Sequence, residues 1–119
     1  MIQRFAGSAA GRSNAVIHNG LVFTVATAKS KSASLGEQTR GALQALDARL
    51  AEAGTDKSRI LSAIVYITDM ARKPEMNAAW DQWVDPANAP QRACIGAVLD
   101  GDDLIEIVVI AAAGASRGN

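Results

Sequence analysis

The sequence predicts a single α+β domain with elements in the order ββαβαββ, forming a mixed sheet with two helices packed on one face. Three observations support this prediction. An Asn-Gly pair at 19–20 separates two β-rich runs, two other segments repeat apolar residues at helical spacing, and the remaining apolar runs are short and rich in β-branched residues. A chain of 119 residues fits one core, so we expect one domain over residues 1–119.

The first predicted element is a β-hairpin in "NAVIHNGLVFTVA", residues 14–26. Asn-Gly readily adopts the two positive φ angles of a type I′ turn, so residues 19–20 are expected to join the two strands. The polar segment 29–34 follows as a loop. A helix is then predicted over about 34–53, because Gly54 suits the position just after a helix end. Four leucines mark its apolar face: Leu35, Leu43, Leu46 and Leu50.

The next two elements are a strand and a second helix. The segment "ILSAIVYITD", residues 60–69, is apolar at both odd and even positions and rich in β-branched residues, which is typical of a buried strand. A helix is predicted over about 74–84, because Pro74 suits its first turn and Pro86 forbids its continuation. Its apolar face carries Met76, Ala79, Trp80 and Trp83.

The segment "APQRACIGAVLDGDDLIEIVVIAA", residues 89–112, supplies the last two strands, which we expect to form a hairpin through the acidic turn at 100–103. Two helices cannot cover both faces of such a sheet, yet the runs 60–67 and 105–110 are apolar on both sides. The spare face is therefore expected to meet another subunit. The tail, residues 114–119, is expected to be frayed.

Charge and composition disfavour several classes of function. Twelve basic and twelve acidic side chains cancel, so binding to a nucleic-acid backbone or an anionic membrane is not expected. The first residues lack the apolar core of a signal peptide and no apolar run is long enough to span a membrane, so we expect a cytoplasmic protein. Cys94 and His18 are each the only residue of their type, so one chain cannot build a disulfide or a zinc site.

Several moderate motifs stand in an order that resembles the RidA/YjgF family over roughly residues 12–112. They are "TVAT" (24–27), "MNAAWDQWV" (76–84), "APQRAC" (89–94) and "IEIVVIAA" (105–112). The resemblance implies a chorismate-mutase-like fold and a homotrimer with pockets between its subunits. It also implies hydrolysis of reactive 2-imino or enamine acids to 2-keto acids and ammonia, without a cofactor or a metal.

The same resemblance implies roles for five residues. Arg92 matches the arginine that binds the substrate carboxylate, and Glu106 matches the pocket glutamate near the attacking water. Cys94 matches a position whose backbone carbonyl positions that water. Asn77 matches a polar position near the pocket, and Ala26 stands where the family usually has the glycine of a Ser-Gly-Gln stretch.

The chemistry of the two charged residues fits these roles. A guanidinium binds a carboxylate through two parallel hydrogen bonds, so Arg92 can orient a 2-imino acid, and lysine is expected to be a poor substitute. The charge state of Glu106 stays open: as a carboxylate it could deprotonate water, and as an acid it could assist the departure of ammonia. In a hairpin, a two- or four-residue loop would send these charges to opposite faces, whereas an odd loop or a bulge at Gly96 would reunite them.

Each candidate also has a purely structural interpretation. Arg92 could belong to a solvated ion pair, and Glu106 could be an outward charge on an edge strand. Cys94 could be a small buried apolar residue, and Asn77 a polar residue facing water. For the whole chain, the alternative is a non-catalytic module of the same fold that binds small carboxylates. Ribonuclease activity is disfavoured by the zero net charge and by the single histidine.

Overall fold

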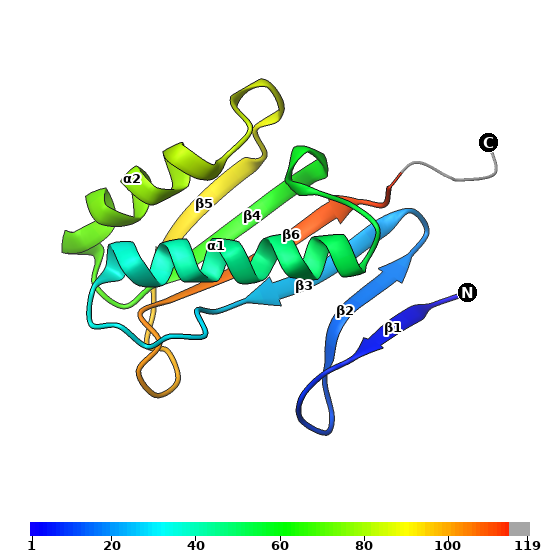
Figure 1. The fold of residues 1–119 in the computed structure, drawn as a ribbon, viewed down its shortest axis with the longest axis horizontal. Helices are drawn as coiled ribbons and strands as arrows, with labels where there is room; N and C mark the ends of the chain where they lie inside the picture. The colour runs from blue at the N-terminus through cyan, green and yellow to red at the C-terminus, as the bar shows by residue number, and fades with distance from the viewer. Residues whose placement is uncertain (115–119) are drawn as a thin grey trace.

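The computed structural model describes residues 1–114, which form an α+β fold of six strands and two helices (Figure 1). The strands are β1 (Gln3–Ala6), β2 (Ser13–His18), β3 (Leu21–Ala26), β4 (Ile60–Ile67), β5 (Gln91–Gly96) and β6 (Ile105–Ala112). The helices are α1 (Leu35–Glu52) and α2 (Lys73–Trp83). The predicted element order is confirmed from β2 onward. The expectation of a frayed tail covers residues 114–119, of which 115–119 lie outside the described part of the chain.

Strand β1 was missing from the prediction. It is only four residues long, and three of the four are exposed, so its sequence has little apolar pattern. Phe5 is the member that packs against the core. β1 pairs antiparallel with β2 and forms one edge of the sheet.

The hairpin of β2 and β3 forms as predicted. Asn19 and Gly20 have φ angles of 50° and 77°, the positive values that both central positions of a type I′ turn require. The register pairs His18 with Leu21 directly across the turn. This turn therefore determines which residues of β3 face the core, namely Val22, Thr24 and Ala26.

The strand order is β1-β2-β3-β6-β4-β5, so the predicted hairpin of the last two strands is wrong. β4 lies between β5 and β6 and pairs parallel with β5 and antiparallel with β6, which makes the sheet mixed. β6 is apolar at every position except Glu106 and takes a central place, whereas the mostly exposed β5 takes the edge. The acidic turn at 100–103 exists, but it belongs to a connection that crosses the end of β4.

Both helices lie on the same face of the sheet, as predicted (Figure 1). α1 begins after Ser34, whose side chain accepts a hydrogen bond from the backbone N–H of Glu37. It is followed by Gly54, which has a φ of 79° and so ends the helix as expected. α2 has Pro74 in its first turn and buries Met76 and Trp80.

The two faces of the sheet differ in burial. Odd-numbered residues of β6 lie beneath the helices and are buried, whereas the even-numbered ones face away and are only half-buried. Beside them, Phe23 and Ile95 are 41% and 43% exposed. We call this surface the open face; it comprises Phe23, Val25, Ile64, Tyr66, Ile95, Glu106, Val108 and Ile110. Within residues 1–114, no helix has the length and apolar character needed to cross a membrane.

Candidate functional site

Arg92 lies on the edge strand β5 and points to the helix-covered face. It pairs with Ala63 of β4, which is buried beneath the helices, so the two side chains share that face. Nη2 of Arg92 donates a hydrogen bond to Oδ1 of Asn77 at 2.8 Å. Nη1 lies 3.6 Å from Sδ of Met76, and the guanidinium carbon lies 5.3 Å from the ring centroid of Trp80. The half-buried arginine is thus held by three uncharged groups.

An ion pair does not explain Arg92. The ion pairs formed among residues 1–114 are Lys31–Asp103 and Arg72–Glu75, on other parts of the surface. Without an acidic partner nearby, no opposite charge offsets that of the guanidinium, and partial burial makes such a charge more costly than in water. Within residues 1–114, Arg92 is therefore not half of a solvated ion pair.

Two further predicted site residues lie next to Arg92. Asn77 stands on α2 and is half-buried, and its side-chain oxygen accepts from the guanidinium, so it does not simply face water. Cys94 follows two residues after Arg92 and pairs with Val65, which is buried under the helices. Cys94 is half-buried and packs against the core. We call Asn77, Arg92 and Cys94 the edge cluster.

Glu106 does not join the edge cluster within one chain. It pairs with Tyr66 of β4, and both side chains lie on the open face. Tyr66 in turn pairs with Ile95, three residues beyond Arg92 on β5. The Cα atoms of Arg92 and Glu106 are therefore separated by about 10 Å along the strands and about 10 Å across two strand spacings, with side chains on opposite faces. Opposite facing was one of the two predicted outcomes, but its cause is the intervening β4 and not the length of a loop.

Ala26 is also separated from the edge cluster. A row of paired residues runs across the sheet from Ala26 through Ile107 and Val65 to Cys94. Three strand spacings place the two ends of this row roughly 14 Å apart. Ala26 is buried on the helix-covered face and lies on β3, directly beside the strand that carries Glu106.

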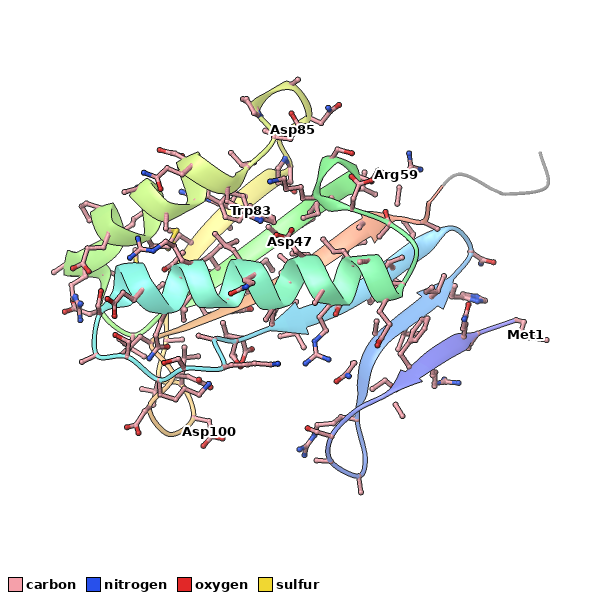
Figure 2. The ribbon with its side chains drawn as sticks, in the orientation of Figure 1. Met1, Asp47, Arg59, Trp83, Asp85 and Asp100 are labelled. Carbon is pink, nitrogen blue, oxygen red and sulfur yellow. The ribbon has the colours of Figure 1, made fainter. Side chains whose placement is uncertain are left out.

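Two tryptophans connect the edge cluster to the rest of the helical layer. The ring centroids of Trp80 and Trp83 are 5.4 Å apart, with their planes tilted by 54°. Nε1 of Trp83 donates to both carboxylate oxygens of Asp47 on α1, at 3.1 and 3.0 Å (Figure 2). The sequence predicted both rings on an apolar face but not the contact of Trp80 with Arg92. The available signal was the spacing of Met76, Asn77 and Trp80, which lie on one side of a helix.

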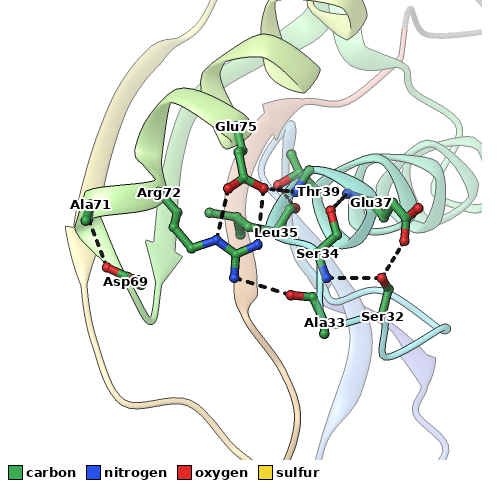
Figure 3. Close-up of polar contacts among 11 residues, drawn as sticks. Ser32, Ala33, Ser34, Leu35, Glu37, Thr39, Asp69, Ala71, Arg72 and Glu75 are labelled. Carbon is green, nitrogen blue, oxygen red and sulfur yellow. Dashed lines mark hydrogen bonds and ion pairs between the residues drawn. The ribbon is translucent and has the colours of Figure 1, made fainter.

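A polar network at the start of α2 fixes this helix against α1 (Figure 3). Nε of Arg72 donates to Oε2 of Glu75 at 2.9 Å, and Nη1 donates to the carbonyl of Ala33 at 3.3 Å. Oε1 of Glu75 accepts from the backbone N–H of Gly36 near the start of α1. The hydrogen bond from Arg72 holds the pKa of Glu75 below its ordinary value, and the same contact raises the pKa of Arg72.

Gln38 is a buried polar residue that the sequence analysis missed. Its Nε2 donates to the carbonyls of Ser32 and Asp102 at 2.7 and 2.9 Å. Its Oε1 accepts from the backbone N–H of Leu104 at 3.0 Å. Gln38 thus joins the loop before α1 to the segment that leads into β6 and Glu106. The signal was a glutamine on the same side of the predicted helix as its leucines.

Two hollows among the described residues lie away from the edge cluster. One, with a volume of about 390 Å³, lies between α1 and the segment that follows β3, with Ala28, Ala48 and Arg49 among its lining residues. Another, of about 420 Å³, lies along the connection from β5 to β6 and includes Val98. In the part of the chain that is described, no three His, Cys, Asp or Glu side chains are grouped to hold a metal ion.

Comparison with known proteins places this fold in a family. The family model described as endoribonuclease L-PSP matches residues 2–113. A RutC family protein of Haemophilus ducreyi is 47% identical over 104 residues, which cover 84% of this chain and 87% of that protein. The RutC family protein YoaB of Escherichia coli is 35% identical over 101 residues, covering 84% of this chain and 89% of YoaB.

Solved structures agree with the sequence comparisons. The crystal structure of a YjgF family member from Neisseria meningitidis superposes with a TM-score of 0.91 at 35% identity, covering 98% of both chains. The family model spans almost the whole chain, and relatives above the 30% identity level cover more than four fifths of it. The chain therefore belongs to the RidA/YjgF family.

Proposed function

We propose that the protein binds 2-imino or enamine acids through their carboxylate and hydrolyses them to 2-keto acids and ammonia. The state of Arg92 is the observation that carries this proposal. Its partners are an amide oxygen, a thioether sulfur and an indole ring, and none of them neutralises its charge. A half-buried cation that lacks a counter-ion favours the binding of an anion.

The unused donors of Arg92 suit a carboxylate. A guanidinium has five N–H donors, and contacts with Met76 and Asn77 occupy two of them, so three remain within the described residues. Two parallel hydrogen bonds to a carboxylate need two of these three. Because α2 already holds the guanidinium in place, less freedom is lost when the ligand binds.

The proposed reaction adds water to the C=N carbon of a 2-imino acid. The nitrogen takes a proton and a tetrahedral carbinolamine forms; the C–N bond then breaks, ammonia leaves with the hydroxyl proton, and a keto group remains. An enamine first becomes an imine by gaining a proton at carbon and losing one from nitrogen. We assign the proton transfers to Glu106, as base for the water and then as acid for the departing nitrogen. Cys94 lies on an edge strand, whose outer carbonyls have no strand partner among residues 1–114 and can accept a hydrogen bond from water.

The proposed site needs more than one copy of the chain, because Arg92 and Glu106 point to opposite faces of the sheet. We propose a homotrimer in which the edge cluster of one subunit meets Glu106 of the next, with Ala26 buried on the adjacent strand β3 of that subunit. One observation supports this arrangement. The open face exposes apolar side chains such as Phe23 and Ile95, which burial between subunits would remove from water.

One observation favours a second candidate, a module that binds small carboxylates without turnover. Glu106 makes no side-chain hydrogen bond within residues 1–114, whereas Arg92 is already positioned by α2. Carboxylate binding depends on Arg92 alone, and catalysis also requires Glu106. Loss of Glu106 should therefore abolish hydrolysis but leave carboxylate binding in place.

The experiment generates 2-imino acids in situ with an amino-acid oxidase and measures their loss and the release of ammonia. The wild-type protein should accelerate both. Arg92→Ala should lose most of the acceleration, and Arg92→Lys should recover little of it, with binding of pyruvate weakened about 10- to 100-fold in each. Arg40→Ala, which removes an exposed arginine of α1, serves as the control and should match the wild type.

The glutamate variant separates the two candidate functions. Glu106→Gln should lose hydrolysis while it keeps pyruvate binding, since the amide has similar size but cannot act as a base. A full hydrolysis rate in this variant would remove Glu106 from the mechanism. Pyruvate binding by a wild-type protein that does not accelerate hydrolysis would establish the binding module instead.

A further inference from the structure

The guanidinium of Arg92 lies against the indole ring of Trp80. Its central carbon is 5.3 Å from the ring centroid of Trp80, within the range of a cation–π contact. Trp80 is only 5% exposed, so its ring is part of the core and cannot swing away to leave the arginine free. One side of the guanidinium therefore faces a fixed indole ring.

The two polar contacts of Arg92 leave its orientation incompletely defined. Oδ1 of Asn77 accepts from Nη2 at 2.8 Å, but the contact of Nη1 with Sδ of Met76, at 3.6 Å, is weak because a thioether is a poor acceptor. The single strong hydrogen bond to Asn77 would still allow the guanidinium plane to rotate about that bond. The Trp80 ring beneath the guanidinium limits this rotation, because turning the group moves its charge away from the ring face.

Trp80 is itself held from two directions. Trp83 packs against it at 5.4 Å, and Trp83 is fixed by hydrogen bonds from its indole nitrogen to Asp47 of α1. Nζ of Lys57 lies 5.2 Å from the Trp83 ring centroid and donates to the Trp83 carbonyl. Trp80 and Trp83 are thus held in place by contacts with α1 and with the segment that precedes β4.

We propose that Trp80 is a positioning residue for Arg92, which sets the plane of the guanidinium and with it the affinity and orientation of the substrate carboxylate. The inference rests on the proposed function for its consequence in catalysis, but the positioning itself is a property of the free protein. The residue touches the arginine and not the reacting atoms. Its loss should therefore raise the KM for a 2-imino acid and the Kd for pyruvate more than it lowers kcat.

Two substitutions and one core control test the proposal. Trp80→Phe retains an aromatic face, and its Kd for pyruvate should stay within about threefold of the wild type. Trp80→Met fills the space with a flexible apolar chain and removes the ring, and its Kd should rise roughly 3- to 30-fold. Leu46→Ala destabilises the core without touching Arg92 and should leave Kd and KM unchanged. Equal Kd values for Trp80→Met and the wild type would overturn the proposal.

Fluorinated tryptophan keeps the test decisive if Trp80→Met does not fold. Fluorine withdraws electron density from the ring and weakens its attraction for a cation with little change in shape. Biosynthetic replacement of both tryptophans with singly and then doubly fluorinated analogues should raise the Kd for pyruvate stepwise. A Kd that is insensitive to fluorination would overturn the positioning role.

The side-chain NMR signal of Arg92 separates this inference from the proposed function. In the free wild-type protein, the nearby ring should shift the Nε–Hε signal of Arg92, and the shift should be smaller in Trp80→Met and remain in Trp80→Phe. A shifted signal without any pyruvate binding or imine hydrolysis would contradict the proposed function alone. Binding and hydrolysis with an Arg92 signal that does not respond to Trp80→Met would contradict the positioning role alone.

Discussion

Alternate residues of β6 experience two different environments. Ile107 and Val109 lie beneath α1 and α2 and are buried, whereas Val108 and Ile110, of the same residue types, lie on the open face and are only half-buried. The residue types alone do not decide which face is buried, since both pairs of side chains are equally apolar. The helices complete one face, so burial of the other face depends on something outside the single chain.

The strongest test of this difference adds a charge to the open face. Ile110→Asp should prevent assembly, because each subunit of the proposed trimer would bury a carboxylate at a cost of several kcal/mol. Sedimentation analysis should then find a mass of one subunit, with the circular dichroism of the fold retained. Gln44→Asp adds the same charge to the exposed side of α1 and should leave assembly unchanged. A trimer that tolerates Ile110→Asp would show that its interface lies elsewhere.

A smaller effect is expected from removing volume on the covered face. Ile107 is fully buried, so Ile107→Ala should lower the free energy of unfolding by about 2–5 kcal/mol. Val108→Ala on the open face is its matched control. In urea unfolding at low protein concentration it should cost less than about 1 kcal/mol, and its cost should grow with concentration if subunits cover it. Similar losses for the two variants in dilute protein would mean that the faces do not differ.

The smallest expected effect is a pH dependence of stability that arises from Glu75 on α2. The pKa of Glu75 lies below its ordinary value of 4.5, chiefly because of the hydrogen bond from Arg72, so this carboxylate stabilises the folded state above that pH. The contribution is lost as the pH falls through the lowered pKa. The difference in unfolding free energy between wild type and Glu75→Gln should therefore be present at pH 7 and disappear in acid.

The arginine partner provides the control for this pH effect. Within an Arg72→Gln background, Glu75→Gln should show much less pH dependence, because the main cause of the lowered pKa is already gone. Unfolding followed in urea between pH 7 and pH 3 gives both differences. A difference in unfolding free energy between wild type and Glu75→Gln that grows as the pH falls would contradict this prediction.

Local signals in the sequence accounted for much of the fold. Asn19 and Gly20 specified a turn whose geometry needs both of them, and the leucines of α1 together with Pro74 placed the helices within a residue or so of their observed ends. Strand pairing was harder, since nothing near 100–103 distinguishes a hairpin from a connection that passes another strand. The hairpin does not form because β4, which is distant in sequence, lies between β5 and β6 and pairs with both.

The candidate site shows the same division. The resemblance identified Arg92 and Asn77, and the structure brings them into contact. It could not show that Glu106 points away from them, because facing depends on the neighbouring strand and not on the residue. The role of Trp80 beside Arg92 was also hidden, because an aromatic residue that fills the core and one that supports a cation share the same spacing on a helix.

The position of β6 has a consequence for the order of folding. Among residues 1–114 it is the last strand, yet it joins β3 to β4 in the middle of the sheet. Until residues 105–112 have left the ribosome, the β1-β2-β3 ribbon and the β4 unit have no shared backbone hydrogen bonds across this gap. The β3–β6 and β4–β6 pairings therefore form late, through contacts between distant segments, and the strand edges that they cover stay unpaired until then.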